Sequence, residues 1–446
     1  MPLRTLVHRS LLLFAVWCAP LGARSRARAQ APSAGRVDER LVAADDTTQH
    51  YAQFLPSGYR TDRRWPVLFV LDPRGRGLHA LRLFADGAER HGYVVLSSYN
   101  SLSDGAREPN VVAMNAMLES AQRRLSIDPQ RIYLAGFSGT ARIVWDFALE
   151  MRGHVAGIIG VGAGIPFVGN GPEVAFAGDS SFAFFGGSGE FDFNYEEVRA
   201  LGERFRIART PYRLVVYPGF HDWPPAAVCS LALAWLDTRA MLGGRSPVDT
   251  FQLGGRRVAD LDSARALEAR GRLADAEDLY DSIARDDRGS AEGTIASARA
   301  AALHRADVVV RYRERGRELA RADQEQSLAL QRVLTAADAE STPPDAETLL
   351  ERLRIAELRR QASSTDSLAS ATARRLLSRT AVFLSFYAPR TYLARGAADR
   401  ALLMLRAASA VAPLRGEACG LLDRAIALSA LRADSDARLC AAAPSR

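Results

Sequence analysis

Ser138 stands where a chain could hold a nucleophile. It is the centre of Gly-Phe-Ser-Gly-Thr at positions 136–140, which follows an apolar run at 131–135 and precedes an amphipathic run at 141–150. Strand, tight turn and helix in this order place a serine at the tip of a sharp turn that tolerates only small neighbours. The first N–H groups of the helix then point toward developing negative charge. The segment predicts a nucleophilic serine, although Thr140 replaces the usual final glycine.

A serine hydroxyl needs a base to take its proton and a carboxylate to orient that base. The apolar run at 182–185 opens into Gly-Gly-Ser-Gly-Glu-Phe-Asp, and the run at 213–217 opens into Pro-Gly-Phe-His-Asp-Trp-Pro. His221 is the only one of the seven histidines that follows a late apolar run in this way. It is the predicted general base. The candidate acids are Asp192 and Glu190.

Residues 40–240 resemble a compact α/β-hydrolase of the esterase and polyhydroxyalkanoate-depolymerase kind. Two motifs carry the resemblance: Asp-Pro-x-Arg-Ile-Tyr at 128–133, which leads into the serine segment, and His-x-Trp-Pro at 221–224. The resemblance covers a little under half of the chain. It implies an α/β-hydrolase fold in which the order of the catalytic residues is serine, acid, histidine.

The resemblance also implies roles. Ser138 would be the nucleophile, His221 the general base and later acid, and Asp192, three residues after Gly189, the orienting acid. The implied activity is hydrolysis of small-molecule or polymeric carboxylic esters through an acyl-enzyme, without a cofactor. The same three residues would equally serve a serine peptidase.

Acyl transfer needs two N–H donors aimed at the tetrahedral oxyanion. The resemblance implies the N–H of Gly139 as one donor, and places the other in the loop after the apolar run at 66–71. That loop begins Asp72-Pro73, where related enzymes usually have His-Gly, and Pro73 has no N–H. Arg74 is therefore the predicted second donor, with Gly75 next.

Aromatic side chains next to the predicted catalytic residues suggest how a substrate is bound. Phe137 and Trp223 lie close to them in sequence and are the predicted substrate contacts. Only about twenty Gly-rich residues, 162–180, lie where many α/β-hydrolases insert a lid, so we expect an open site. No His, Cys or carboxylate spacing suggests a metal, and no Gly-rich loop opens a helix to bind phosphate.

Apolar runs and amphipathic segments alternate before residue 245. The runs are 66–71, 92–97, 131–135, 155–161, 182–185 and 213–217. Continuous apolar strands separated by amphipathic helices indicate a mostly parallel sheet covered by helices on both faces. We therefore predict an α/β domain, the hydrolase-like unit, at 36–242.

After Gly-Gly-Arg-Ser-Pro at 243–247, strand-like runs vanish and Ala, Leu, Arg and Glu recur with helical spacing. This predicts an all-α domain at 255–440. Segments 264–283 and 396–413 resemble each other, and the second resembles the tetratricopeptide consensus, in which Gly turns between helices and Pro ends the unit. Their separation is not a multiple of the roughly 34-residue period, so the repeats would be irregular. The alternative is an ordinary Ala-rich helical bundle.

The first 29 residues read as a secretory signal peptide. They have a basic start, an apolar run at 11–19 and Ala-Arg-Ala at 27–29, with cleavage expected after Ala29. No other run is long enough to span a membrane. We therefore expect a secreted or periplasmic protein.

The net charge of +7 does not indicate a nucleic-acid-binding protein. Five of the arginines fall in the first 29 residues, which leaves 53 basic against 51 acidic side chains, dispersed along the chain. Nucleic-acid binding needs clustered cations. In an oxidising compartment Cys419 and Cys440 are a plausible disulfide, the alternative being that the cysteines are buried thiols.

A second hypothesis belongs to a different class of protein. The departures at Thr140 and Asp72-Pro73 would suit a catalytically silent hydrolase fold that serves as a platform. Its helical repeats would then hold a protein partner, since repeat domains commonly bind extended segments on a concave face.

Overall fold

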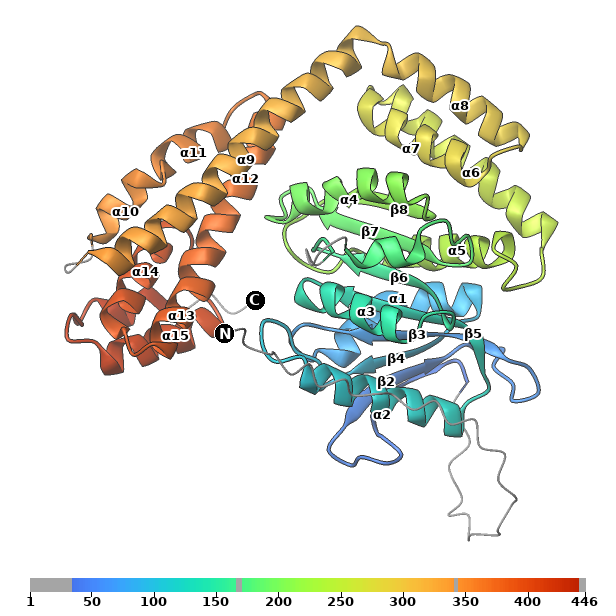
Figure 1. Ribbon diagram of the computed structural model, residues 1–446, viewed down its shortest axis with the longest axis horizontal. Helices are drawn as coiled ribbons and strands as arrows, with labels where there is room; N and C mark the ends of the chain where they lie inside the picture. Colours follow the sequence, from blue (N-terminus) through green and yellow to red (C-terminus); the bar gives the residue numbers. More distant parts are fainter. Residues whose placement is uncertain (1–33, 166–170, 341–343, 441–446) are drawn as a thin grey trace, which may run out of the picture.

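The computed structural model describes residues 34–165, 171–340 and 344–440. Figure 1 shows a sheet covered by helices in the first half of the chain and helices alone in the second half. The predicted signal peptide, residues 1–29, lies outside the described residues.

Eight strands form one sheet, in the order β1-β2-β4-β3-β5-β6-β7-β8. β2 is antiparallel to both β1 and β4, and every neighbouring pair from β4 to β8 is parallel. This is the α/β-hydrolase fold, so the predicted fold class is confirmed. The strands are β1 (Arg36–Val42), β2 (His50–Leu55), β3 (Trp65–Leu71), β4 (Val94–Ser98), β5 (Ile127–Phe137), β6 (Val155–Val161), β7 (Ala183–Gly189) and β8 (Tyr212–Tyr217).

The six predicted apolar runs all coincide with or overlap strands, from β3 to β8. β1 and β2 were not among the predictions. β1 reads Arg-Val-Asp-Glu-Arg-Leu-Val and lies at the edge of the sheet, where its side chains remain partly or fully exposed. An edge strand does not need the continuous apolar run that marks a buried parallel strand.

Alternate side chains of each central strand pack on opposite faces of the sheet, as the two-residue period of a strand requires. In β3, Val67, Phe69 and Leu71 belong to one core, while Leu68 and Val70 belong to the other. Helices α2 (Glu108–Arg124), α3 (Gly139–Glu150) and α4 (Tyr195–Ala208) cover the first face, and α1 (Gly77–His91) and α5 (Ala226–Leu242) cover the second. The short helix η1 (Pro172–Phe176) also packs on the first face.

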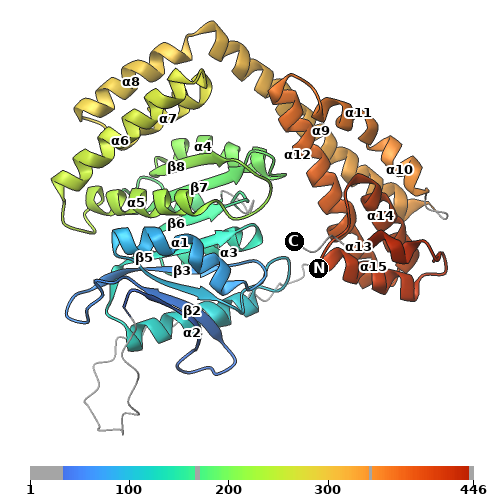
Figure 2. The same cartoon turned by 180° about the vertical axis from the view of Figure 1, so that it is seen from behind.

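The second half is helical, as predicted. Figures 1 and 2 show it as an arch: α6, α7 and α8 lie beside the β8 edge, α9 extends away from them, and the remaining helices lie beside one end of the strands. The helices are α6 (Thr250–Ala269), α7 (Leu273–Asp286), α8 (Ala291–His304), α9 (Asp307–Ala339), α10 (Ala346–Arg352), α11 (Ile355–Ala362), α12 (Ser367–Val382), η2 (Phe383–Tyr387), α13 (Ala388–Ala394), α14 (Ala398–Val411), α15 (Glu417–Leu428) and η3 (Asp436–Cys440).

Glycines turn the chain between helices at two predicted positions. Gly271, with φ +74°, separates α6 from α7, and Gly396, with φ +73°, separates α13 from α14. Both lie in the left-handed region that favours glycine. The α-helices of this half range from 7 to 33 residues in length. The tetratricopeptide-like repeat itself stays a prediction.

Cys419 of α15 and Cys440 of η3 form a disulfide, with their Cα atoms 5.7 Å apart. The pairing proposed from the sequence is therefore present, and Cys229 is a buried thiol. Among the described residues, no helix combines the length and apolar character needed to cross a bilayer.

Candidate active site

Ser138 lies at the junction of β5 and α3, with φ 54° and ψ −127°. Two glycines make room for this turn. A Cβ on Gly136 would lie 2.5 Å from the carbonyl oxygen of Thr140, and a Cβ on Gly139 would lie 2.5 Å from Cβ of Ser103. Any larger side chain at either position would force the turn apart.

Thr140, which departs from the expected glycine, has a structural role. Its side chain is fully buried. Its hydroxyl oxygen accepts a hydrogen bond from the N–H of Phe137 at 3.1 Å and donates to the carbonyl oxygen of Leu71 at 2.6 Å. One hydroxyl therefore joins the turn after β5 to the end of β3. A glycine here could make neither bond.

The structure brings Ser138, His221 and Asp192 together. His221 Nε2 lies 2.8 Å from Oγ of Ser138, and His221 Nδ1 lies 2.9 Å from Oδ1 of Asp192. These residues follow β5, β8 and β7, whose carboxyl ends meet at one edge of the sheet. With the proton on Nδ1, the ring donates to the carboxylate and its Nε2 is free to accept the serine proton.

Asp192 rather than Glu190 contacts the histidine. Asp192 is fully buried, and its Oδ1 also accepts a hydrogen bond from the N–H of Asn194 at 2.8 Å. Its own N–H donates to the carbonyl oxygen of Gly189 at 3.1 Å, which closes a tight turn after β7. Glu190 contributes its N–H to Tyr217 and leaves its side chain partly exposed.

Two aromatic rings hold the imidazole of His221 from the sides. The centroid of the Phe137 ring lies 4.6 Å from that of His221, and the centroid of Phe193 lies 4.1 Å away. The His221 side chain keeps 17% of its surface exposed. The ring is therefore fixed in orientation while one edge remains accessible.

Asp72 has a structural role in the loop after β3. It is fully buried and accepts hydrogen bonds from the Arg74 N–H at 2.8 Å, the Trp223 Nε1 at 2.8 Å and the Arg76 guanidinium at 3.0 Å. Burial alone would raise the pKa of Asp72, but the bonds from Arg76 and Trp223 outweigh it and lower that pKa below its usual value. The ionised Asp72 carboxylate therefore links the end of β3 to the loop after β8 that carries His221.

The predicted second oxyanion donor requires a correction. The Arg74 N–H is used by the Asp72 carboxylate, and the Gly75 N–H donates to the carbonyl oxygen of Asp72 at 3.2 Å. Both candidates are thus held within their own loop, because an aspartate readily bonds the N–H two residues ahead. Gly139 lies at the first position of α3, where a helix N–H has no partner within the helix.

The predicted substrate contacts are also corrected. Phe137 is 4% exposed and Trp223 is 6% exposed, and their rings pack against each other with centroids 5.6 Å apart. Trp223 further meets the ring of Phe84 edge-on. Burial of a large aromatic side chain is strongly favourable because it removes much apolar surface from water. Both rings therefore pack in the core beneath the site. They support the catalytic loops instead of facing a substrate.

The helical half also reaches this site, which the sequence did not reveal. Arg375 and Arg379 of α12 donate hydrogen bonds to the carbonyl oxygens of Glu190 and Phe193, on either side of Asp192. Their four-residue spacing places them on one face of a helix. Arginines at this spacing are common in the second half of the chain, so no signal separated these two from the others.

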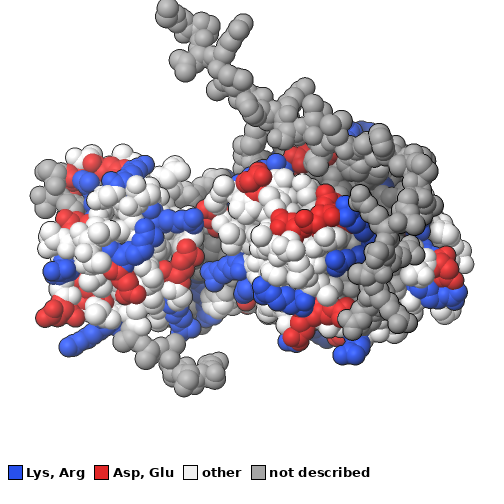
Figure 3. Space-filling model, turned by 90° about the horizontal axis from the view of Figure 1, so that it is seen from below, with Lys and Arg blue, Asp and Glu red and all other residues white. Residues whose placement is uncertain are grey.

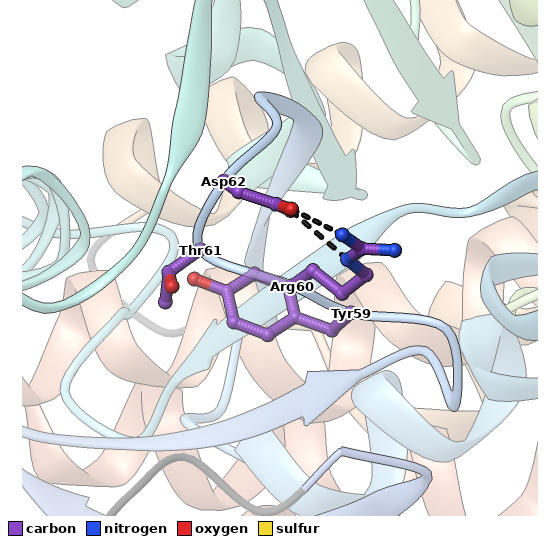
Figure 4. A pocket seen from close by; sticks show the side chains of 4 residues that line it. All are labelled: Tyr59, Arg60, Thr61 and Asp62. Carbon is purple, nitrogen blue, oxygen red and sulfur yellow. Dashed lines mark hydrogen bonds and ion pairs between the residues drawn. The ribbon is translucent and has the colours of Figure 1, made fainter.

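A second hollow among the described residues lacks this combination of groups. This hollow, lined by Tyr59, Arg60, Thr61 and Asp62 (Figure 4), lies before β3, at the amino end of the parallel strands and so away from Ser138. Arg60 and Asp62 are paired there. On the visible part of the face in Figure 3, arginine and acidic side chains are interspersed. Within the described residues, no cluster of three His, Cys, Asp or Glu side chains could hold a metal ion.

Solved structures similar to this chain include three hydrolases. An S-formylglutathione hydrolase from Staphylococcus aureus is 13% identical over 47% of this chain and 99% of its own, with a TM-score of 0.36. A ferulic acid esterase is 15% identical over 46% and 98%, with a TM-score of 0.38. A thermostable esterase is 20% identical over 45% and 62%, with a TM-score of 0.36. No protein-family model and no curated protein matches the chain.

Proposed function

We propose that the protein is a secreted or periplasmic serine hydrolase that cleaves carboxylic esters. The observation that carries the proposal is a continuous relay of two hydrogen bonds, from Ser138 Oγ to His221 Nε2 at 2.8 Å and from His221 Nδ1 to Asp192 Oδ1 at 2.9 Å. Nucleophile, base and orienting acid are each within hydrogen-bond reach of the next, which is the geometric requirement for activating a serine.

In the first step, Oγ of Ser138 attacks the ester carbonyl carbon while Nε2 of His221 takes the hydroxyl proton. The carbonyl oxygen becomes an oxyanion, which the N–H of Gly139 is placed to stabilise at the start of α3. The tetrahedral intermediate then expels the alcohol, to which Nε2 returns the proton. Asp192 stabilises the imidazolium that exists between the two transfers.

In the second step, His221 takes a proton from water, and the resulting hydroxide attacks the acyl group on Ser138. The carbonyl–Oγ bond breaks, Oγ recovers the proton from Nε2, and the carboxylic acid leaves. No metal or cofactor is required for either step, since the imidazole carries every proton.

The proposed location agrees with the cysteine chemistry. Disulfides form and persist mainly in oxidising compartments, and the Cys419–Cys440 bridge favours such a compartment. The signal peptide expected at residues 1–29 would direct the chain there.

A hydrolysis assay tests the proposal. We expect the wild-type protein to hydrolyse short p-nitrophenyl esters, and Ser138→Ala and His221→Ala each to lose at least about a thousandfold in kcat. A fluorophosphonate probe should label Ser138 in the wild type and nothing in Ser138→Ala. Activity that survives both substitutions would exclude this triad.

The same assay decides among the alternatives. Probe labelling of Ser138 with cleavage of peptide amides in preference to esters would indicate a peptidase. A folded wild type that neither binds the probe nor cleaves any ester would indicate a silent platform for a protein partner. The motif departures no longer favour that platform, because Thr140 and Asp72 both have structural roles at the site.

A further inference from the structure

The loop that carries Asp192 is held from outside the sheet. Arg375 donates from its NH1 to the carbonyl oxygen of Glu190 at 3.1 Å, and Arg379 donates from its NH2 to the carbonyl oxygen of Phe193. Both arginines belong to α12, more than 180 residues further along the chain. The two accepting carbonyls lie two residues before and one residue after the proposed catalytic acid.

The two guanidinium groups are themselves fixed. Arg375 has 7% of its side chain exposed, donates to Oγ1 of Thr372 at 2.8 Å and lies 4.0 Å from the centre of the Tyr195 ring. Arg379 is ion-paired with Asp323 of α9 at 2.6 Å. Thr372 and Asp323 therefore anchor the two arginines within the helical half, and Tyr195 of α4 contacts Arg375 from the other side of the interface.

We propose that Arg375 and Arg379 are positioning residues that make the helical half a structural part of the active site, by holding the 190–193 loop so that Asp192 orients His221. This inference rests on the proposed hydrolase function. The arginines touch neither the substrate nor the reacting atoms, so they act through the loop.

The N–H groups of Glu190 and Phe191 tie the loop to the end of β8, and the two arginines hold the carbonyl oxygens of Glu190 and Phe193. Connecting segments move more than the strands they join, and residues 190–193 belong to no helix or strand. Arg379 holds Phe193, whose ring lies 4.1 Å from that of His221, and thereby also limits the movement of the imidazole. A displacement of about 1 Å in a catalytic group can lower the rate about a hundredfold.

The helical half approaches the opposite side of the site as well. Tyr387 of η2 donates to Oδ1 of Asp104 at 3.4 Å, and Ser103, beside Asp104, packs against Gly139. Burial and the nearby Asp104 raise the pKa of Tyr387 to about 12, so the phenol remains a donor at neutral pH. The helical half thus borders the site on two sides. The expectation of an open site rests on the short 162–180 segment alone and does not include these helices.

The test compares kcat and KM on a short p-nitrophenyl ester. We expect Arg375→Ala and Arg379→Ala each to lower kcat about tenfold, and the double variant about a hundredfold, with KM within twofold of wild type. Arg375→Lys and Arg379→Lys keep a cationic donor and should have kcat values between those of the alanine variants and wild type. A loss confined to KM, or lysine variants no better than alanine, would contradict positioning through the loop.

Arg406→Ala is the matched control. Arg406 forms an ion pair with Asp436 inside the helical half, at 2.7 Å, and contacts nothing at the site. This variant tests whether the loss of any ion-paired arginine in the helical half lowers activity. We expect its kcat to match wild type, and a loss equal to that of Arg379→Ala would overturn the inference.

Hydrogen–deuterium exchange provides a readout independent of turnover. The N–H groups of Asp192 and Asn194 are hydrogen-bonded within the loop, and we expect both to exchange at least tenfold faster in the double variant but not in Arg406→Ala. Unchanged protection at 189–196 would overturn the inference even if activity fell. If exchange were faster in the double variant but the wild type cleaved no ester, the positioning role of the two arginines would be supported and only the proposed function would be refuted.

Discussion

Ser138 is held in a backbone conformation that residues other than glycine seldom adopt, with φ 54° and ψ −127°. Strain of this kind costs about 1–3 kcal/mol and persists only where the surroundings impose it. The close contacts of Gly136 and Gly139 and the two hydrogen bonds of Thr140 impose it here. The strain presents Oγ at the tip of the turn, within reach of His221.

Substitution of Asp192 tests the polarity of the relay. In Asp192→Asn the amide could donate to Nδ1 and leave the proton on Nε2, where it could no longer accept the serine proton. We expect kcat on a p-nitrophenyl ester to fall by on the order of 10⁴ while KM changes little. The buried site keeps its shape because the two side chains have nearly the same volume.

Glu190→Gln is the control for that measurement. Glu190 is also an acid of the same loop, but its contacts to the rest of the protein run through its backbone. Its kcat should remain within about twofold of wild type. If Glu190→Gln lost as much activity as Asp192→Asn, the acid would have been assigned to the wrong residue.

The residue types at the ends of strands carried enough information to find the relay. Ser138, Asp192 and His221 each follow an apolar run, and each proved to lie at the carboxyl edge of the sheet. Arg74 does not fit the predicted donor role because Asp72 supplies a competing acceptor for its N–H. Asp72 stands two residues before it, and this spacing is typical of an aspartate that folds back onto the backbone.

At the scale of elements, Asp72 joins three parts of the fold. It follows β3, it binds Arg76 directly before α1, and it accepts from Trp223 in the loop after β8. Because its pKa is lowered in the folded protein, the ionised carboxylate stabilises the fold. That contribution is fully present above the unfolded pKa and is lost as the pH falls below about 4.

We therefore expect the effect of Asp72→Asn to depend on pH. At pH 7 the variant should be less stable by about 2 kcal/mol, a figure reduced from that of a fully buried pair because Arg76 is partly exposed to solvent. Near pH 3 the difference should shrink, since the carboxylate of the unfolded chain is then largely protonated and the ionised folded form loses part of its advantage. The midpoint of urea unfolding, followed by tryptophan fluorescence at both pH values, measures this difference. Asp62→Asn, which removes an exposed ion pair with Arg60, is the control whose midpoint should match that of wild type at either pH.

The central parallel strands are predictable from the sequence, whereas β1 and β2, the first two strands of the sheet, are not. β3 and β6 are buried at every position and appear in the sequence as continuous apolar runs. β1 carries four charged residues among seven and pairs only with β2, so nothing local distinguishes it from a loop. Its place in the sheet depends on a neighbour that supplies the hydrogen bonds.

At the scale of the whole molecule, two contact regions between the helical half and the sheet domain lie far apart among the described residues, besides the contact of Tyr387 with Asp104. One is the acid loop, held by α12. The other is the β8 edge, where Arg213 contacts α6 and α7. Neither could be predicted from the sequence, because both depend on arginines pairing with groups tens to nearly two hundred residues away. The composition change near residue 245 marked where the helical half begins but not what it touches.

Arg213 should matter to the stability of the whole arch. Its side chain is 3% exposed and forms ion pairs with Asp260 at 2.9 Å and with Asp286 at 2.8 Å. Burial opposes the charge, but the two aspartates outweigh it and raise the pKa of Arg213 above its usual value. Without Arg213, Asp286 loses its ion pair while Asp260 keeps the one with Arg256, and leaving a buried charge without its partner typically costs about 3–5 kcal/mol.

We accordingly expect Arg213→Leu to unfold at a markedly lower urea concentration than wild type, and to lose ester hydrolysis at that same lower concentration. Arg206→Ala removes an exposed ion pair from α4 and should change neither. Adding Asp286→Leu to Arg213→Leu removes the uncompensated charge and should recover part of the lost stability. If Arg213→Leu unfolded at the same urea concentration as wild type, the ion pairs at the β8 edge would not be what holds the helical half in place. The position of α12 on the acid loop would then have to depend on α9 alone.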